Sequence, residues 1–364
     1  MFLEFISITS YKNLREVSLE LSPTLNYFVG SNGAGKTNVL DAIHYLSLTK
    51  SAVKTTDTRC VMHGESFFML RGEYSLDERK EVITVSYSTQ HKKKTVMRGG
   101  KEYERFSEHI GRFGVVMISP ADSSLISDEP ENRRRFIDTF FSQIDSEYLN
   151  ILVRYNSVLQ QRNTILKSEC VDDELLEIYT LQLSELAQSV AYKRSALIEQ
   201  LAPLVAHYYS VISGDKEVIE VKYKSQLNNY NIYELLTHNL QRDKILGYTT
   251  AGVHRDDLTL TMNCEAIRAY GSQGQQKSLL LALKLAEAKI MGEKTLRRPI
   301  LLLDDIFDKL DMARVENLIR LVSGEDFGQI FLSDASKVRL ESIAQRFNAD
   351  YKLFEVSEGQ IQQQ

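Results

Sequence analysis

Two short stretches of the chain contain residues suited to binding phosphate groups and a metal ion. The first is Gly30-Ser31-Asn32-Gly33-Ala34-Gly35-Lys36-Thr37, between an apolar segment at 25–29 and a helical pattern from 37 to 48. Glycines let a backbone wrap around phosphates with its N–H groups inward, and a helix N-terminus adds partial positive charge. Lys36 would supply a full charge, and the Thr37 hydroxyl can bind Mg²⁺. The spacing GxxxxGK[ST] in this context predicts a site for a nucleoside triphosphate.

The second stretch is 300–305, where four apolar residues are followed by Asp304 and Asp305. This pattern is typical of a strand buried on both faces of a parallel sheet, with charges at its carboxyl end. Asp304 is placed to hold the Mg²⁺ shell, and Asp305 to polarise an attacking water. A chance glycine turn or a turn after a core strand would explain either stretch alone, and their joint occurrence favours a nucleotide site.

A third stretch, Ser272-Gln273-Gly274-Gln275, opens a predicted helix of roughly twenty residues whose leucines belong to the core. Ser272 can cap that helix. Capping alone does not require a glycine between two glutamines, whereas a phosphate does. Small residues allow its close approach, hydroxyl and amide groups donate to it, and the helix dipole favours an anion.

Composition limits the class of protein. The chain has 364 residues, 43% of them hydrophobic and 26% charged, which is ordinary for a soluble globular protein. Its net charge of −5 does not indicate a nucleic-acid binder, although a local basic face can act within an acidic whole. Cys60, Cys170 and Cys264 are far apart, so we expect neither zinc ligation nor disulfides. Since no signal peptide and no apolar run of membrane-spanning length is visible, we expect a cytoplasmic protein that does not span a membrane.

Strand and helix patterns alternate at both ends of the chain, and a helical block lies between them. Residues 66–98 form a strand-rich meander, and 132–209 have the apolar spacing of two long helices packed antiparallel. We therefore expect an α/β fold. One discontinuous domain would comprise 1–120 and 245–364, with 121–244 inserted as a helical lobe.

The order of the motifs resembles that of ABC-type ATPases, in the class shared with SMC proteins and repair ATPases. Longer stretches resemble the bacterial RecF family of recombination-repair proteins: SPADSSLISDEPENRRRFID (119–138), VHRDDL (253–258), GSQGQQKS (271–278) and PILLLDDIFDKLD (299–311). The N-terminal LEFISITSYKNLREVSLEL is also similar to that family. The resemblance extends over nearly the whole chain, in the same order.

The resemblance implies an ABC-type P-loop ATPase head with an inserted, mostly helical second domain and no long coiled coil. It further implies ATP and Mg²⁺ as ligands, slow ATP hydrolysis that acts as a switch, and a homodimer that forms on ATP. The implied partners are duplex DNA, junctions between duplex and single-stranded gaps, and the RecO and RecR proteins, with which such proteins help to load RecA.

The resemblance also assigns roles to residues of this chain. Lys36, Asp304, Asp305 and Ser272 are expected to act in catalysis, and Thr37 and Asp304 to bind Mg²⁺. In an ABC head the second phosphate contact comes from the opposite subunit, so Ser272–Gln275 would contact the γ-phosphate held by a partner copy. The expected nucleotide-binding residues are Gly30, Ser31, Asn32, Gly33, Ala34, Gly35, Lys36, Thr37, Asn38, Ser272, Gln273, Gly274 and Gln275.

This chain departs from the wider ABC pattern at three places. Asp305 stands where many ABC proteins carry glutamate, and its shorter side chain fits slow hydrolysis. No glutamine occurs in 59–68, where a glutamine loop is expected. Ser333-Asp334-Ala335 stands where a switch histidine would follow the penultimate strand.

Three polar clusters leave alternatives open. His91-Lys92-Lys93-Lys94, with Arg98 and Lys101, could bind DNA phosphates or protect a solvated strand edge. Arg133–Arg135 could bind DNA, reach the other subunit or pair with the acidic 128–131. His254–Asp257 could form an internal ion-pair network or a hinge between domains.

Other classes of protein fit less well. A nuclease would need a further cluster of metal-binding carboxylates, and a helicase would need further nucleic-acid motifs. A transporter ATPase subunit would carry Leu-Ser-Gly-Gly-Gln and a switch histidine.

The loop assignment predicts the behaviour of Lys36→Arg. This variant should bind ATP but hydrolyse it poorly, because a guanidinium is bulkier than an ammonium and directs its donors differently. Nucleotide binding and phosphate release, measured on the same preparation, check both halves of the prediction. Hydrolysis at the normal rate would contradict the assignment of 30–37 as the phosphate loop.

Overall fold

The computed structural model describes residues 1–53, 55–77, 79–127, 129–168, 170–214, 217–308, 310–324, 326–336 and 351–364. The chain divides into two compact units. The first comprises 1–123, 211–214 and 272–364, and the second comprises 124–210 and 215–271. The two ends of the chain thus build one unit and the middle builds the other.

The first unit contains an antiparallel sheet made from the N-terminal third of the chain. Its strand order is β2-β1-β4-β5-β6-β7. Buried and less buried residues alternate along β4, as expected for a strand with one face toward a core. The strands are β1 (Phe2–Tyr11), β2 (Leu14–Glu20), β4 (Phe67–Leu76), β5 (Arg79–Ser88), β6 (Lys93–Arg98) and β7 (Lys101–Glu102).

A second sheet of the first unit has the order β15-β14-β3-β13-β12-β8. All its neighbouring pairs are parallel except β14 and β15. Every residue of β3, β8, β12 and β13 is buried, as their apolar sequences predicted. The strands are β3 (Leu25–Val29), β8 (Val115–Ile118), β12 (Ile300–Asp304), β13 (Ile330–Asp334), β14 (Tyr351–Ser357) and β15 (Gln360–Gln363).

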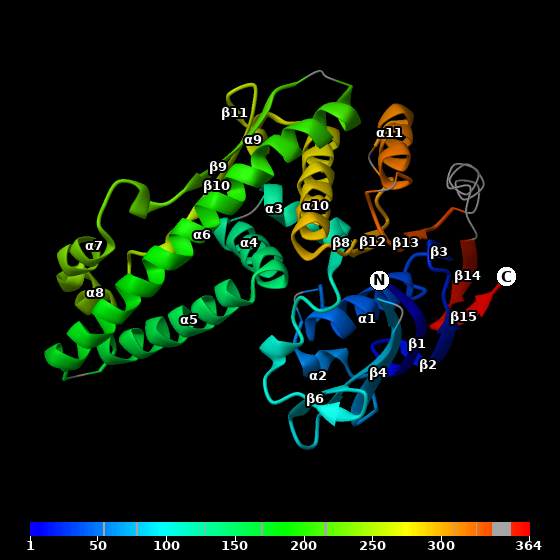
Figure 1. Ribbon diagram of the computed structural model, residues 1–364, viewed down its shortest axis with the longest axis horizontal. Helices are drawn as coiled ribbons and strands as arrows, with labels where there is room; N and C mark the ends of the chain where they lie inside the picture. The colour runs from blue at the N-terminus through cyan, green and yellow to red at the C-terminus, as the bar shows by residue number, and fades with distance from the viewer. Residues whose placement is uncertain are drawn as a thin grey trace. The chain divides into compact units, whose positions relative to one another are not determined.

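Helices complete the first unit. Helix α1 (Lys36–Leu48) contacts strands of both sheets, so one apolar core joins the sheets through it (Figure 1). Helix α10 (Gln273–Thr295) contacts β8, and α11 (Met312–Val322) and the short α2 (Asp57–Cys60) are also part of this unit.

The parallel sheet brings distant residues to one edge. In the register of β12 and β13, Asp304 lies opposite Ser333, and in that of β13 and β3, Asp334 lies opposite Val29. The phosphate loop begins directly after Val29, so it starts at the edge where Asp304 ends its strand. This is where ligands bind in open α/β sheets.

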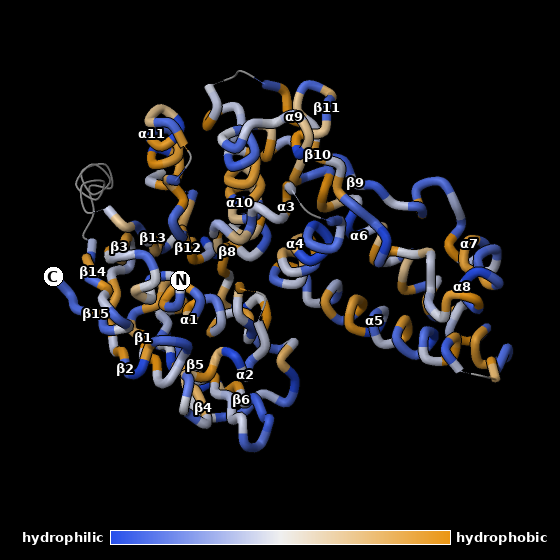
Figure 2. The backbone as a smooth tube through the Cα atoms, turned by 180° about the vertical axis from the view of Figure 1, so that it is seen from behind, coloured by the Kyte–Doolittle hydropathy of each residue, from blue (hydrophilic) through white to orange (hydrophobic). Residues whose placement is uncertain are grey.

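The second unit is mostly helical, and its described elements include a small sheet of order β11-β10-β9. Only Tyr148, Tyr155, Arg162 and Leu166 are buried in α5. The tube of Figure 2 alternates in hydropathy along this helix. The elements are α3 (Ser124–Ser127), α4 (Pro130–Ile144), α5 (Ser146–Leu166), α6 (Asp173–Ser213, whose last three residues belong to the first unit), β9 (Ile219–Lys224), α7 (Ile232–His238), α8 (Leu240–Leu246), β10 (Asp257–Met262), β11 (Glu265–Ala266) and α9 (Ile267–Tyr270).

Contacts between α5 and α6 show that the two helices run antiparallel, as their apolar spacing predicted. Lys193 of α6 forms an ion pair with Asp145 at the start of α5, and Arg162 near the end of α5 donates to Thr180. Residues 245–271 pack within the second unit, whereas the division made from the sequence assigned them to the ATPase domain. The reason is strand pairing, because β10 pairs along its full length with β9.

Gln329 joins the two sheets of the first unit. It lies just before β13 and is 1% exposed. Its Oε1 accepts from the Leu3 amide at 2.8 Å, and its Nε2 donates to the carbonyls of Leu3 at 2.8 Å and Ser22 at 2.7 Å. One side chain therefore satisfies three buried backbone groups of the other sheet and the chain that follows it.

Gln329→Leu tests this link. The substitution removes the Gln329 partner of the Leu3 amide and carbonyl, whereas the Ser22 carbonyl still accepts from the Asn26 side chain at 2.8 Å. Each buried unsatisfied group costs about 1–3 kcal/mol, so we expect the free energy of unfolding in urea to fall by about 2 kcal/mol or more, with an unchanged slope against denaturant. Gln360→Leu, at an exposed position of β15, is the control. Equal stability of the two variants would show that Gln329 does not join the sheets.

Candidate nucleotide-binding site

Residues of the loop between β3 and α1 line one pocket. Gly33 and Gly35 have φ values of 84° and 120°, in the left-handed region that favours glycine. Gly35 is also the N-cap of α1, and no described side chain caps this helix end. The first N–H groups of α1 are therefore not claimed by a side-chain cap and can bind an anion.

Gly30 meets a separate constraint. A Cβ atom there would lie 2.1 Å from the Val356 carbonyl oxygen of β14, so no other residue fits without a backbone shift.

Lys36 is 7% exposed, and its ammonium group stays within the loop. Its Nζ donates to the carbonyl oxygens of Gly30 at 2.6 Å and Ser31 at 2.9 Å. Both acceptors are neutral carbonyl groups, and the ammonium also acts through its charge on Asp304, whose pKa it lowers against the larger effect of burial. The lysine thus supplies a positive charge to the pocket, as the motif predicted.

Asp304 is the centre of a hydrogen-bonded cluster. Its carboxylate accepts from the Thr37 hydroxyl at 2.8 Å and 3.0 Å and from the Ser333 hydroxyl at 2.6 Å. Burial raises the pKa of the Asp304 carboxyl, against the effect of the two hydroxyl donors, which lower it. The cluster joins residues from α1, β12 and β13.

Asp305 occupies a strained position beside Asp304. Its φ is 48°, unusual for a residue other than glycine, and its amide donates to the Ser333 carbonyl at 3.2 Å. This backbone turns the chain out of β12. Asp305 joins the loop residues in lining one pocket of about 320 Å³, formed by Asn32, Gly33, Gly35, Lys36, Thr37, Asn38, Asp304 and Asp305.

Two residues not identified from the sequence brace the loop. Asn13, in the turn after β1, donates to the Ala34 carbonyl at 3.3 Å and accepts from the Asn38 side chain at 2.7 Å. Gly359, in the turn between β14 and β15, donates its amide to the same carbonyl at 2.9 Å. No sequence motif marks either residue, because the contacts depend on how distant turns meet. One feature of the sequence could have identified Ser333: it ends an apolar stretch that forms the strand next to the Asp304 strand.

The donor set fits Mg²⁺. The Thr37 hydroxyl and the Asp304 carboxylate are hard oxygen ligands that already lie within hydrogen-bond distance of each other at the pocket. Thr37 and Asp304 are the residues that would hold the ion.

Ser272–Gln275 lies at the exposed N-terminus of α10. The Ser272 hydroxyl accepts from the Gln275 amide at 3.3 Å, and the Gln275 Oε1 accepts from the Ser272 amide at 2.8 Å, which forms a capping box. Ser272 and Gln273 are exposed, and none of the four residues is among those that line the nucleotide pocket. Within one chain, the structure does not bring this stretch to the phosphate loop.

The expected positions of the glutamine loop and the switch residue do not line the pocket. Residues 59–68 include the end of α2, a bridge from Val61 to Tyr11 and the start of β4. Ser333 is committed to the Asp304 carboxylate.

Part of the basic hairpin is paired. Lys93 lies 3.2 Å from a Glu102 carboxylate oxygen, and Lys94 lies 2.8 Å from that of Asp57. The Arg98 guanidinium donates two hydrogen bonds to the Glu81 carboxylate, at 2.9 and 3.0 Å. These pairs fit the alternative of a protected strand edge. A role of His91, Lys92 and Lys101 in DNA binding stays a prediction.

The other two polar clusters meet inside the second unit. Arg133 forms an ion pair with Asp257 at 2.6 Å, and Arg134 donates to the Asp256 carbonyl at 2.7 Å. The buried Arg194 adds hydrogen bonds to the Val253 carbonyl and to Asp256. Of the alternatives for His254–Asp257, the internal network is therefore confirmed.

Arg135, the last arginine of that run, is exposed and pairs with Glu131. Asp128, the first residue of the acidic stretch, lies outside the described residues.

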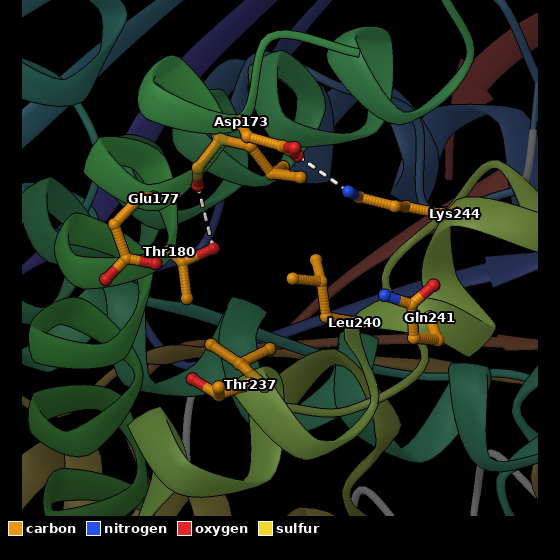
Figure 3. A pocket seen from close by; sticks show the side chains of 9 residues that line it. Asp173, Glu177, Thr180, Thr237, Leu240, Gln241 and Lys244 are labelled. Atoms are coloured by element: carbon orange, nitrogen blue, oxygen red, sulfur yellow. Dashed lines mark hydrogen bonds and ion pairs between the residues drawn. The ribbon is translucent and has the colours of Figure 1, made fainter.

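A second pocket, of about 350 Å³, lies within the second unit between α6, α7 and α8 (Figure 3). Asp173 and Glu177 are part of its wall, and Lys244 points to Asp173, 2.6 Å away. Glu177 accepts from the Tyr233 hydroxyl at 2.7 Å. The described residues that line this pocket include two carboxylates and no glycine, a set that does not suit a triphosphate.

The parallel sheet, the glycine loop and the Asp304 cluster define a P-loop ATPase of the ABC type. A family model described as "RecF/RecN/SMC N terminal domain" matches residues 2–358. Two curated relatives called "DNA replication and repair protein RecF" are each 43% identical over 362 residues. That of Bacteroides thetaiotaomicron covers 99% of this chain and 98% of its own, and that of Parabacteroides distasonis covers 100% and 99%. The chain belongs to the RecF family of DNA replication and repair proteins.

Solved structures agree with this assignment. "Structure of the recombination mediator protein RecF-ATP in RecFOR pathway" has a TM-score of 0.89 and 29% identity, and the match covers 100% of this chain and 97% of that chain. An SMC head bound to the C-terminal winged-helix domain of ScpA has a TM-score of 0.59 at 16% identity, which shows the shared head fold alone. No helix in the described part of the chain has the length and apolar character of a membrane span.

The raised pKa of Asp304 predicts a gain in stability for Asp304→Asn. A carboxyl whose pKa is raised by folding stabilises the protein below the ordinary aspartate pKa, and that contribution is lost as the pH rises through the folded value. At pH 7 the buried charge is therefore a cost that asparagine removes. We expect a higher Tm than wild type at pH 7, a difference that shrinks toward pH 4, and strongly reduced ATP hydrolysis. A lower Tm at pH 7 would contradict the burial effect.

Proposed function

We propose that this protein is an ATP-dependent DNA-binding switch of recombinational repair and replication. ATP would bind to the 30–38 loop, and two copies would then close so that Ser272–Gln275 of each contacts the nucleotide held by the other. One observation carries the proposal: among the described residues that line the pocket, those that can donate to a phosphate all belong to the 30–38 loop. The second stretch suited to phosphate binding, Ser272–Gln275 at the N-terminus of α10, is not among the residues that line the pocket, and Ser272 and Gln273 are exposed.

The residues of one chain have distinct tasks in this scheme. The Lys36 ammonium would exchange the carbonyls of Gly30 and Ser31 for the β- and γ-phosphates. Mg²⁺, when bound, supplies charge neutralisation at these phosphates. Thr37 and Asp304 would orient the phosphate side of the pocket, and Asp305 would accept a hydrogen bond from the attacking water. Asp305 carries a short side chain on a fixed backbone turn, which supports slow hydrolysis and hence a switch.

Family membership supports the DNA side of the proposal. The relatives are named for DNA replication and repair, and two related solved structures are described as the recombination mediator protein RecF in the RecFOR pathway. We infer that the ATP-bound dimer binds duplex DNA and the junctions at single-stranded gaps, where it works with RecO and RecR to help load RecA. This role would place the protein in the cytoplasm with the chromosome.

A nuclease is the weaker alternative. Such an enzyme would need clustered metal ligands, and in the part of the chain that the structure describes no group of three or more His, Cys, Asp or Glu side chains could hold a metal ion.

Ser272→Arg tests the composite site. An arginine at the N-terminus of α10 adds bulk and charge where a partner would have to approach, so ATP-dependent dimerisation should be lost. ATP binding by the monomer should stay within about twofold of wild type, because Ser272 is outside the pocket lining. Solution mass with and without ATP and Mg²⁺ measures the first effect, and nucleotide titration the second.

Ser66→Arg is the matched control, since it places the same charge at another exposed serine of the same unit. Duplex DNA should stimulate the ATPase activity of this control and of wild type, but not that of Ser272→Arg. A Ser272→Arg protein that dimerises normally would contradict the proposal, as would a wild-type protein that stays monomeric with ATP.

A further inference from the structure

One lysine connects the helix that bears Ser272–Gln275 to the loop that bears Asp305. Lys277 lies in the second turn of α10, and its Nζ donates to the Asp308 carbonyl at 2.5 Å and to the Asp305 carbonyl at 3.5 Å. Both acceptors belong to the chain that leaves β12. All of these residues are in the first unit.

A second contact strengthens the same connection. Arg314, in the first turn of α11, donates to the Ser278 hydroxyl of α10 at 3.2 Å, and its own amide is capped by the Asp311 carboxylate at 2.9 Å. The turn at 305–308 is therefore attached to α10 by Lys277, and Asp311 is attached to it through Arg314.

The distances along α10 make this connection mechanically direct. A helix rises about 1.5 Å per residue, so Lys277 lies only about 8 Å along the axis from Ser272. A displacement of the α10 N-terminus is therefore passed to Lys277 with little loss. Asp305 has few ways to absorb such a displacement independently, because its backbone is in the left-handed region and its amide is bound to the Ser333 carbonyl.

We propose that Lys277 is a positioning residue that couples the two nucleotide sites of the dimer. This inference rests on the proposed function, in which Ser272–Gln275 touches the nucleotide of the partner copy. Contact with that nucleotide fixes the α10 N-terminus, Lys277 then fixes the 305–308 turn, and the turn sets where Asp305 lies in the pocket of its own chain. Occupation of one site thus prepares the other for hydrolysis.

Lys277→Met removes the ammonium while it keeps most of the aliphatic stem. The dependence of ATPase rate on ATP concentration should be cooperative in wild type, with a Hill coefficient that approaches the number of sites, about 2. In Lys277→Met we expect a Hill coefficient of about 1 and a kcat several-fold lower, with ATP-dependent dimerisation unchanged. Lys277→Arg, which keeps donors for the two carbonyls, should restore much of the cooperativity.

Lys289→Met is the matched control on the same helix. Lys289 pairs with Asp326 and Glu293 at the surface, so its loss should leave cooperativity and kcat at wild-type values. Thermal melts of all the variants show whether each one is folded. Lys277→Gln, which retains a single donating amide, provides a second test should Lys277→Met be unstable.

The outcomes separate this inference from the proposed function. If Lys277→Met dimerises on ATP and keeps its cooperativity, Lys277 does not couple the sites, although the composite site stands. If Lys277→Met fails to dimerise, the residue builds the dimer contact itself and the coupling role is overturned. If wild type forms no ATP-dependent dimer, the proposed function and this inference fall together.

Discussion

The hydrogen bond between Thr37 and Asp304 is the contact on which the site depends. It joins residues that are 267 positions apart, one at the start of α1 and the other at the end of β12. The bond forms because β3, β13 and β12 are parallel neighbours whose carboxyl ends share an edge. The fold therefore needs both chain ends in one unit, and the second unit enters as an insertion between them.

Burial of the Asp304 carboxylate lowers the stability of the fold, at a residue that the proposed function requires. Its pKa is raised mainly by loss of water, and the hydroxyls of Thr37 and Ser333 offset part of that effect. A positive φ at Asp305 adds backbone strain at the neighbouring position. A buried carboxyl and a left-handed residue thus stand next to each other at the edge where the phosphate loop begins, a combination that often occurs at functional sites.

The sequence predicted the parts whose chemistry is local. The glycine loop, the buried Asp304 strand and the helix that begins at Ser272 are each encoded by a continuous stretch, and each lies where its pattern predicted. Asn13 and Gly359 could not be predicted, because they act on Ala34 only after three distant turns have met. The end of the second unit was also missed, since the pairing of β10 with β9 is a long-range contact that local periodicity does not show.

The partners of the basic residues could not be predicted from the sequence either. The sequence left DNA binding, contact with the other subunit and pairing with 128–131 open for Arg133–Arg135, and the first two of these arginines contact 256–257 inside the second unit. A run of cations predicts charge but not its partner. The partner depends on tertiary packing, which brings the VHRDDL loop to α4.

Complementation between two inactive subunits tests the central claim most directly. Lys36→Ala and Ser272→Arg each damage a different half of the composite site, so each variant alone should lack ATP-dependent dimerisation and hydrolysis. In a mixed dimer, one site combines the intact Lys36 of one chain with the intact Ser272 of the other. The account predicts that mixing the two proteins restores dimers and part of the ATPase activity, because one site is intact and the introduced arginine faces the nucleotide-free pocket of the Lys36→Ala chain. A mixture as inactive as its components would contradict a site shared between two copies.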